Sequence, residues 1–171
     1  SSPLAPLLSG SLNRWRWGSS PLIRMTTPRL STLKGFVLHR GVSPLDGSEF
    51  VVIATLKSGN RKTGDMIQIW ILRADQDPVA AIQSGADVTV CGDCIHRKQA
   101  DGTRSCYVNA GQAPLSVWRT WKRGGYLENP STELIARALK GRRIRWGSYG
   151  DPAIIPAHIV ALWNEHADGW T

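Results

Sequence analysis

The sequence predicts an α/β (or α+β) fold, in which an antiparallel hairpin half is followed by a cysteine loop and an incomplete β-α half. Three observations predict it. β-branched apolar runs dominate residues 35–72, all three cysteines lie within residues 91–106, and helical patterns alternate with a strand from residue 114 onward. A chain of 171 residues is long enough to bury the core of one ordinary domain.

The first half is predicted to be antiparallel β structure. Strand-like runs cover residues 35–40, 50–56 and 66–72, and polar segments rich in Gly, Asn and Asp separate them at residues 43–47 and 58–65. Apolar runs joined by such segments are typical of β-hairpins.

The segment that leads to the cysteines is predicted to contain a helix and then a strand. Asp77 is a suitable N-cap, Pro78 a suitable first helical residue, and Gly85 a suitable end of that helix. The Val-Thr-Val run at residues 88–90 is expected to form a short strand that ends at Cys91.

Beyond the cysteine loop the chain is predicted to alternate between helix and strand. Helices are expected over residues 114–122 and 131–140 and from Pro156 onward, with a strand at residues 143–147. In the first of these helices a core-facing apolar stripe is expected at Leu115, Trp118 and Trp121. A β-α-β-α succession normally continues into a further strand, so we expect the domain to be truncated at its C-terminus.

Charge and composition divide the chain into a leader and a body. Residues 1–30 contain four arginines and no acid, which predicts a disordered or non-native leader before a single domain over residues 31–171. The net charge is +8, and half of it lies in the leader, so the body is only mildly basic. The net charge suggests an acidic partner such as nucleic acid, and the mildly basic body weakens this inference.

The sequence also bears on where the protein works. No apolar run is long enough to cross a membrane, and no secretory segment is apparent. We therefore expect a cytoplasmic protein, in a bacterium or a phage-infected host, whose thiols are reduced. Nothing in the sequence indicates an oligomeric state.

The cysteines are the strongest chemical signal. Cys91 and Cys94 form a Cys-x-x-Cys pair, Cys106 returns after a polar loop, and His96 offers an imidazole nearby. Soft ligands of this kind suit zinc or an iron–sulfur cluster, with His96 either as the fourth ligand or as support for one. Disulfide pairing would leave one thiol over. A redox-active Cys91–Cys94 pair and unbound structural thiols stay open as alternatives.

Two further places carry candidate residues. The basic hairpin tip with Lys62 and Thr63 is either a contact for an anion or nucleic acid or a solvated turn. Tyr149 and Asp151 follow the predicted strand at residues 143–147, and ligands gather at the carboxyl ends of strands in α/β folds. Asp151 is therefore a candidate catalytic residue, or it only caps the turn that follows.

Four motifs together resemble a known group of proteins. They are Asn60-x-Lys62-Thr63-Gly64, Cys91-Gly92-Asp93-Cys94, Ser105-Cys106-Tyr107-Val108-Asn109 and Arg145-x-Gly147-x-Tyr149-Gly150-Asp151-Pro152. In this order they resemble an uncharacterised family of phage and actinobacterial proteins, similar to the phage "gene product eighty-eight" domain, over roughly residues 35–171. The resemblance implies a phage or prophage origin and a shared cysteine-bound centre, but no activity. We take the motif residues Asn60, Lys62, Thr63 and Tyr149 as candidate cofactor-binding residues.

Three functions are consistent with these patterns. The first is a metal-stabilised protein associated with nucleic acid, with phosphate contacts from Arg61, Lys62, Arg97, Lys98 and Arg104. The second is a metalloenzyme whose zinc or iron–sulfur cluster lies beside Asp151. The third is a small structural or interaction protein in which the metal only stabilises the fold.

Overall fold

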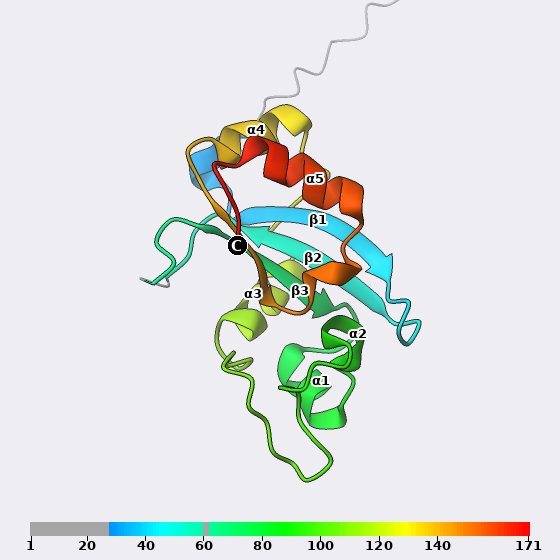
Figure 1. Ribbon diagram of the computed structural model, residues 1–171. Helices are drawn as coiled ribbons and strands as arrows, with labels where there is room; N and C mark the ends of the chain where they lie inside the picture. Colours follow the sequence, from blue (N-terminus) through cyan, green and yellow to red (C-terminus); the bar gives the residue numbers. More distant parts are fainter. Residues whose placement is uncertain (1–27, 60–61) are drawn as a thin grey trace, which may run out of the picture.

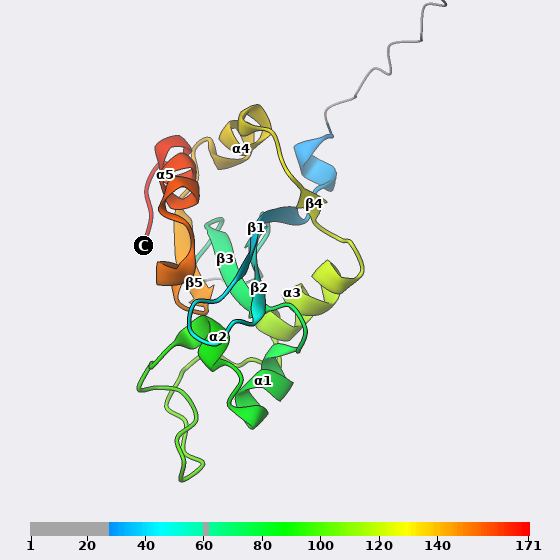
Figure 2. The same ribbon diagram turned by 90° about the vertical axis from the view of Figure 1, so that its right-hand side faces the viewer.

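A five-stranded mixed sheet with helices on both faces forms the body of the protein (Figures 1 and 2). This computed structural model describes residues 28–59 and 62–171. The strand order is β4-β1-β2-β3-β5. The α/β prediction is therefore confirmed.

The three central strands form the predicted antiparallel half. They are β1 (Gly35–Val42), β2 (Glu49–Thr55) and β3 (Ile67–Arg73), and both of their pairings are antiparallel. Nearly every residue of β2 and β3 is buried. Such continuous burial arises because helices cover both faces of the sheet.

The outer strands are parallel to their neighbours. β4 (Leu127–Glu128) pairs with β1 at one edge, and β5 (Ile144–Tyr149) pairs with β3 at the other. After the last helix the chain returns to this second edge, where Trp170 forms a parallel bridge with Ile144. The return lies beside β5, the place where the sequence predicts a further strand.

Two helices cover each face of the sheet. α4 (Thr132–Leu139) and α5 (Ala157–His166) lie on one face, and α1 (Pro78–Ser84) and α3 (Ala113–Lys122) lie on the other (Figure 2). Short 3-10 turns, η1 (Leu30–Thr32) and η2 (Pro152–Ile154), precede β1 and α5. None of the helices in the described part of the chain has the length and hydropathy needed to cross a bilayer.

The helix ends and apolar faces follow the sequence signals. Asp77 accepts hydrogen bonds from the first turn of α1, and Ser131 accepts one from Leu134 in α4. One face of α4 is buried, and it comprises Leu134, Ile135, Ala138 and Leu139. In α3 only Trp121 of the expected stripe is buried, whereas Leu115 and Trp118 are half-buried.

The strand expected at residues 88–90 is wrong, because this segment begins a one-turn helix, α2 (Val88–Cys91). The Cys91 amide donates to the Asp87 carbonyl at 2.9 Å, and the Thr89 hydroxyl donates to the Ala86 carbonyl at 2.9 Å. A run of three residues is too short for the spacing of its apolar side chains to distinguish a strand from a helix. The surrounding contacts therefore decide its conformation.

Trp163 joins α5 to the sheet and provides a test of the core. Its ring meets Phe36 of β1 edge-on at 6.1 Å between centroids, and only 2% of the residue is exposed. We predict that Trp163→Ala lowers the free energy of unfolding by about 3–5 kcal/mol in denaturant titrations, because it opens a large cavity. Trp170→Ala is the matched control, since Trp170 is 55% exposed. Equal losses in the two variants would contradict this packing.

Candidate metal centre

A cavity of about 270 Å³ lies where α2, the loop after it and the turn after β5 meet. Its lining brings together most of the candidate residues found in the sequence, namely Cys91, Cys94, His96, Cys106, Tyr149 and Asp151. These residues come from two regions far apart in the chain, residues 91–106 and residues 149–151. The cavity lies at the carboxyl ends of β3 and β5, the edge where the sequence predicts a ligand site.

The hairpin-tip residues lie elsewhere. Lys62 and Thr63 belong to the turn before β3, whereas the cavity adjoins the other end of that strand. Lys62 is exposed and Thr63 is half-buried. Asn60 and Arg61 lie outside the described residues. The structure thus does not bring Lys62 and Thr63 to the cysteines.

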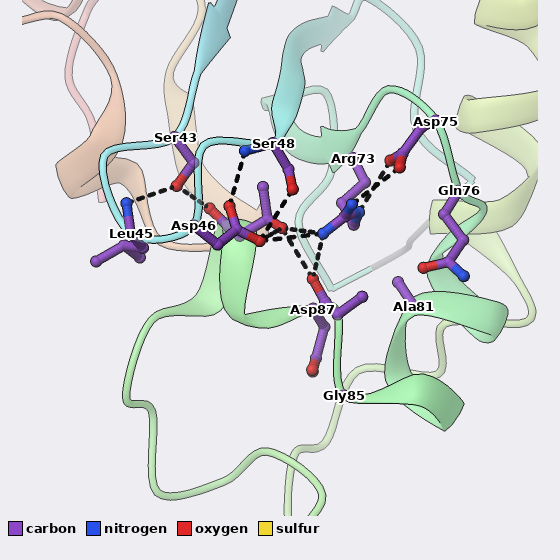
Figure 3. Close-up of polar contacts among 12 residues, drawn as sticks. Ser43, Leu45, Asp46, Ser48, Arg73, Asp75, Gln76, Ala81, Gly85 and Asp87 are labelled. Carbon is purple, nitrogen blue, oxygen red and sulfur yellow. Dashed lines mark hydrogen bonds and ion pairs between the residues drawn. The ribbon is translucent and has the colours of Figure 1, made fainter.

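Arg73, at the end of β3, connects the start of α2 to the sheet (Figure 3). Its side chain is only 10% exposed. Its guanidinium donates to Asp46 at 3.2 Å, to the Ala86 carbonyl at 3.0 Å and to the Thr89 hydroxyl. It also forms two hydrogen bonds of 2.9 Å with Asp75. These contacts hold the β1–β2 turn, β3 and α2 together.

The β1–β2 turn makes further contacts with α2. The Thr89 hydroxyl lies 2.6 Å from the Asp46 carboxylate, and the Ser43 hydroxyl donates to the Thr89 carbonyl at 2.8 Å. Ser48 also donates to Asp46 through its amide and its hydroxyl. Burial raises the pKa of Asp46, but the hydrogen bonds from Thr89 and Ser48 and the charge of Arg73 outweigh it and leave that pKa below its ordinary value.

A second arginine holds the start of the cysteine loop. Arg97 pairs with Asp87, which is 2% exposed, through contacts of 2.6 and 3.0 Å. It also donates to the carbonyls of Gly92 and Gly85 at 2.9 and 2.7 Å. A buried carboxylate needs such a partner. The loop therefore leaves α2 in a fixed direction, along the cavity wall.

The loop returns to the cavity as a hairpin. The Gln99 amide donates to the Thr103 carbonyl at 2.8 Å, and the Cys106 amide donates to the His96 carbonyl at 3.0 Å. His96 Nδ1 lies 2.9 Å from the Ser105 hydroxyl. This pairing brings Cys106 back beside the Cys-x-x-Cys segment, and the loop projects from the body below α1 and α2 (Figures 1 and 2).

The three thiols share the cavity but differ in exposure. Cys91 and Cys106 are half-buried, Cys94 is exposed, and all three are free. Burial, together with the nearby Asp87 carboxylate, raises the pKa of Cys91 to about 12, so this thiol carries its proton at neutral pH. Within the described residues, no three His, Cys, Asp or Glu side chains stand close enough together to hold a metal ion.

Tyr149 contributes an unsatisfied hydroxyl to the same cavity. The residue is 4% exposed, and its hydroxyl has no hydrogen-bond partner among the described residues. Burial raises its pKa well above the ordinary value, and the negative charge of Asp87 adds to the shift. A buried hydroxyl without a partner costs about 1–3 kcal/mol, which points to a partner supplied by a ligand.

Asp151 both lines the cavity and caps the turn that follows. Its carboxylate accepts from the Ala153 amide at 2.9 Å, as the capping alternative predicts. Its own amide donates to the Val90 carbonyl in α2 at 2.6 Å. This bond holds the β5 turn against the helix that carries Cys91.

Gly150 makes this close approach possible. Its φ is +82°, and a Cβ atom there would lie 2.8 Å from both Cβ and the carbonyl oxygen of Ile71. Just before it, the pairing of β5 with β3 shifts register between Gln68 and Trp70. The irregular end of β5 therefore turns Tyr149 and Asp151 toward the cysteines.

Sequence reasoning did not single out Asp87 as part of this site. It pairs with Arg97 across the Cys-x-x-Cys segment, and no local spacing rule indicates such a pair. Arg104 is likewise expected to contact phosphate, yet its guanidinium donates to the carbonyls of Cys106 and Val108 at 3.2 and 3.0 Å. Lys98 donates to the Gln83 carbonyl at 3.3 Å.

Comparison with known proteins gave no match: no family model fits the sequence, and no curated protein or solved structure is similar enough to report.

A pair of glycine variants tests the packing behind the cavity. We predict that Gly150→Ala lowers the free energy of unfolding by about 2–4 kcal/mol, because strain at positive φ adds to a collision with β3. Gly141→Ala is the matched control, since Gly141 has a φ of +71° but open space around it. Its loss is about 1 kcal/mol, as backbone strain alone requires. If both variants lose the same amount, β5 does not approach β3 as described.

The pH dependence of stability tests the contacts that Arg73 and Thr89 make with Asp46. A carboxylate whose pKa is lowered by folding contributes stability above its unfolded pKa, and this contribution is lost as the pH falls through the folded value. We predict that the unfolding free energy falls below about pH 4 and that Asp46→Asn makes this fall shallower while lowering stability at neutral pH. Urea titrations over a pH series measure it, with Glu165→Gln on α5 as control. If the free energy of unfolding changes with pH in the same way in the wild type and in Asp46→Asn, the Asp46 carboxylate does not stabilise the fold through Arg73.

Proposed function

We propose that this protein binds a cysteine-ligated metal centre, either zinc or an iron–sulfur cluster, with Cys91, Cys94 and Cys106 as its ligands. One observation carries the proposal. Three thiols from both sides of a hairpin loop line a single cavity, and a buried tyrosine hydroxyl without a partner lines it too. Thiolates are the preferred protein ligands of both kinds of centre.

Binding requires two changes from the metal-free arrangement. The first is loss of the thiol protons, above all that of Cys91, and a cation in the cavity favours this because it stabilises the thiolate. The second is closure of the hairpin toward α2, since the thiols share a cavity without yet converging on one point. The bond from the Cys106 amide to the His96 carbonyl lies within the loop and keeps Cys106 beside the Cys-x-x-Cys segment. Arg97, Lys98 and Tyr107 bond to the rest of the domain, so closure has to rearrange these contacts.

The ligand at the fourth coordination position of the metal distinguishes a structural centre from a reactive one. His96 lines the cavity, and Ser105 occupies its Nδ1, which leaves Nε2 to serve as a ligand. Without His96, three thiolates leave an open coordination position, which is the pattern of catalytic rather than structural zinc sites.

A metalloenzyme is the second candidate function, and the opposite wall of the cavity favours it. There the Tyr149 hydroxyl is positioned to donate a hydrogen bond to a ligand, and the Asp151 carboxylate to accept a proton. Neither role is required of a centre that serves only to stabilise the fold.

The loop is less suited to nucleic acid than to metal. Arg97, Lys98 and Arg104 bind carbonyl groups of the protein, and Arg97 also pairs with Asp87. Phosphate contacts by these side chains would compete with the bonds that shape the cavity. The resemblance to the phage domain rests on the same cysteines and favours the same centre.

We predict that protein purified without oxygen contains about one equivalent of zinc, or iron and sulfide in the ratio of a cluster with a broad visible absorption band. Cys91→Ser, Cys94→Ser and Cys106→Ser each remove most of the metal, because each deletes one of only three thiolates. Elemental analysis and absorption spectra measure both results. A fully folded wild-type protein that takes up neither zinc nor iron would overturn the proposal.

Two histidine variants decide the fourth ligand. If His96 binds the metal, His96→Ala lowers the metal content or its retention against a chelator by about 10-fold or more. His158→Ala is the matched control, because His158 is exposed on α5, away from the cavity. Unchanged retention in His96→Ala assigns the fourth position to an exchangeable ligand.

A further inference from the structure

A second, larger cavity of about 900 Å³ lies between α3 and the sheet, and the proposed metal centre does not use it. Its floor is formed by β2, β3 and β5, and its walls by α3, Tyr126 and the chain before β1. The volume lies at the upper end of the range for small-molecule sites.

The floor of this cavity is a row of polar side chains across an otherwise apolar sheet. Thr55 pairs with Gln68, and Gln68 pairs with Arg145, so the three lie side by side on neighbouring strands. Thr55 and Gln68 are only 8% and 2% exposed. Buried polar groups in a sheet reduce its stability unless they are hydrogen-bonded.

Hydrogen bonds hold this row in place. Gln68 accepts from the Ser148 hydroxyl at 2.8 Å and donates to the Met66 carbonyl at 3.2 Å. Thr55 accepts from the indole of Trp70 at 3.0 Å. The floor is therefore a pre-organised polar surface, bordered by the Trp70 ring.

The helix wall is built from small side chains, which explains why the space stays open. The residues of α3 that line the cavity follow helical spacing, and they are Ala113, Ser116, Val117 and Thr120. Opposite them stands Tyr126, whose ring packs against β1 so closely that a Cβ atom at Gly35 would lie 3.0 Å from it. None of these groups is long enough to fill the space.

The charge of the lining has one sign. Lys34, Lys57 and Arg145 line the cavity, and none of the described lining residues is acidic. The ion pairs found among the described residues involve other arginines, namely Arg40, Arg73 and Arg97. Lys57 donates to the Ser31 carbonyl, and Arg145 donates to the Tyr107 hydroxyl, and both bonds leave the charges uncompensated.

We propose that this cavity binds a phosphate-bearing small molecule of nucleotide size, with Lys34, Lys57 and Arg145 around the phosphates. Three cations without a carboxylate select an anion, and the hydroxyls of the wall add donors for phosphate oxygens. The rings of Trp70 and Tyr126 offer apolar surface for a planar group such as a base. The proposal is independent of the metal centre.

Titration calorimetry of the full-length protein at low salt tests this site, with ADP and pyrophosphate as probes. Each of Lys57→Gln and Arg145→Gln is expected to weaken ADP binding about 10-fold or more, because each removes a charge-assisted contact to phosphate. Lys140→Gln is the matched control, since Lys140 is exposed at the end of α4 on the other face of the sheet. It is expected to leave ADP binding unchanged.

A filling variant tests the cavity without changing its charge. Ser116→Phe is expected to abolish ADP binding, whereas Ala161→Phe, at an exposed position of α5, retains it. Circular dichroism checks that each variant folds. If Ser116→Phe fails to fold, the two glutamine variants still decide the question, because Lys57 is exposed and Arg145 is only half-buried, so neither substitution alters the apolar core.

Three outcomes would overturn the proposal. In the first outcome the wild type gives no binding heat with either probe. In the second, ADP binds equally well to all the variants, which means that it binds outside this cavity. In the third outcome a single-stranded oligonucleotide binds with the same dependence on Lys57 and Arg145 while ADP does not, which assigns the cavity to nucleic acid instead.

Discussion

The buried guanidinium of Arg73 is the constraint on which the candidate centre depends. A charge that is 10% exposed must be paired, and its partners come from the β1–β2 turn, the residues after β3 and the segment that enters α2. These segments cannot shift independently without leaving that charge unsatisfied. α2, which carries Cys91, is thereby fixed at the carboxyl edge of the sheet. The hydrogen bond from Asp151 to Val90 then holds the end of β5 against it.

The two cavities meet different parts of one strand, β5. Tyr149 and the turn after it face the cysteines, whereas Arg145, earlier in the same strand, reaches the larger cavity. The two are connected, because Arg145 donates to the hydroxyl of Tyr107, a residue that lines the cysteine cavity. An anion that engages Arg145 would compete for this bond.

Sequence patterns predict the elements that depend on local chemistry. The three antiparallel strands, the cap at Asp77 and the helix that begins after Ser131 follow from hydrophobic period and capping preference. α2 does not, because its conformation is set by contacts with Arg73 and Asp46, far away in sequence. The polar row Thr55–Gln68–Arg145 is equally hidden, since strand register decides which residues stand side by side. The cysteine spacing indicates a ligand set, but only the fold brings Tyr149 into the same cavity.

X-ray absorption spectroscopy at the metal edge of the anaerobically purified protein tests the central claim most directly. The account predicts three sulfur neighbours for zinc at about 2.3 Å together with one lighter ligand, or the sulfur-rich shell of an iron–sulfur cluster. Loss of one sulfur neighbour in Cys106→Ser would show that the hairpin closes onto α2. A metal surrounded only by nitrogen and oxygen would contradict the account, because the thiols would then share the cavity without serving as ligands.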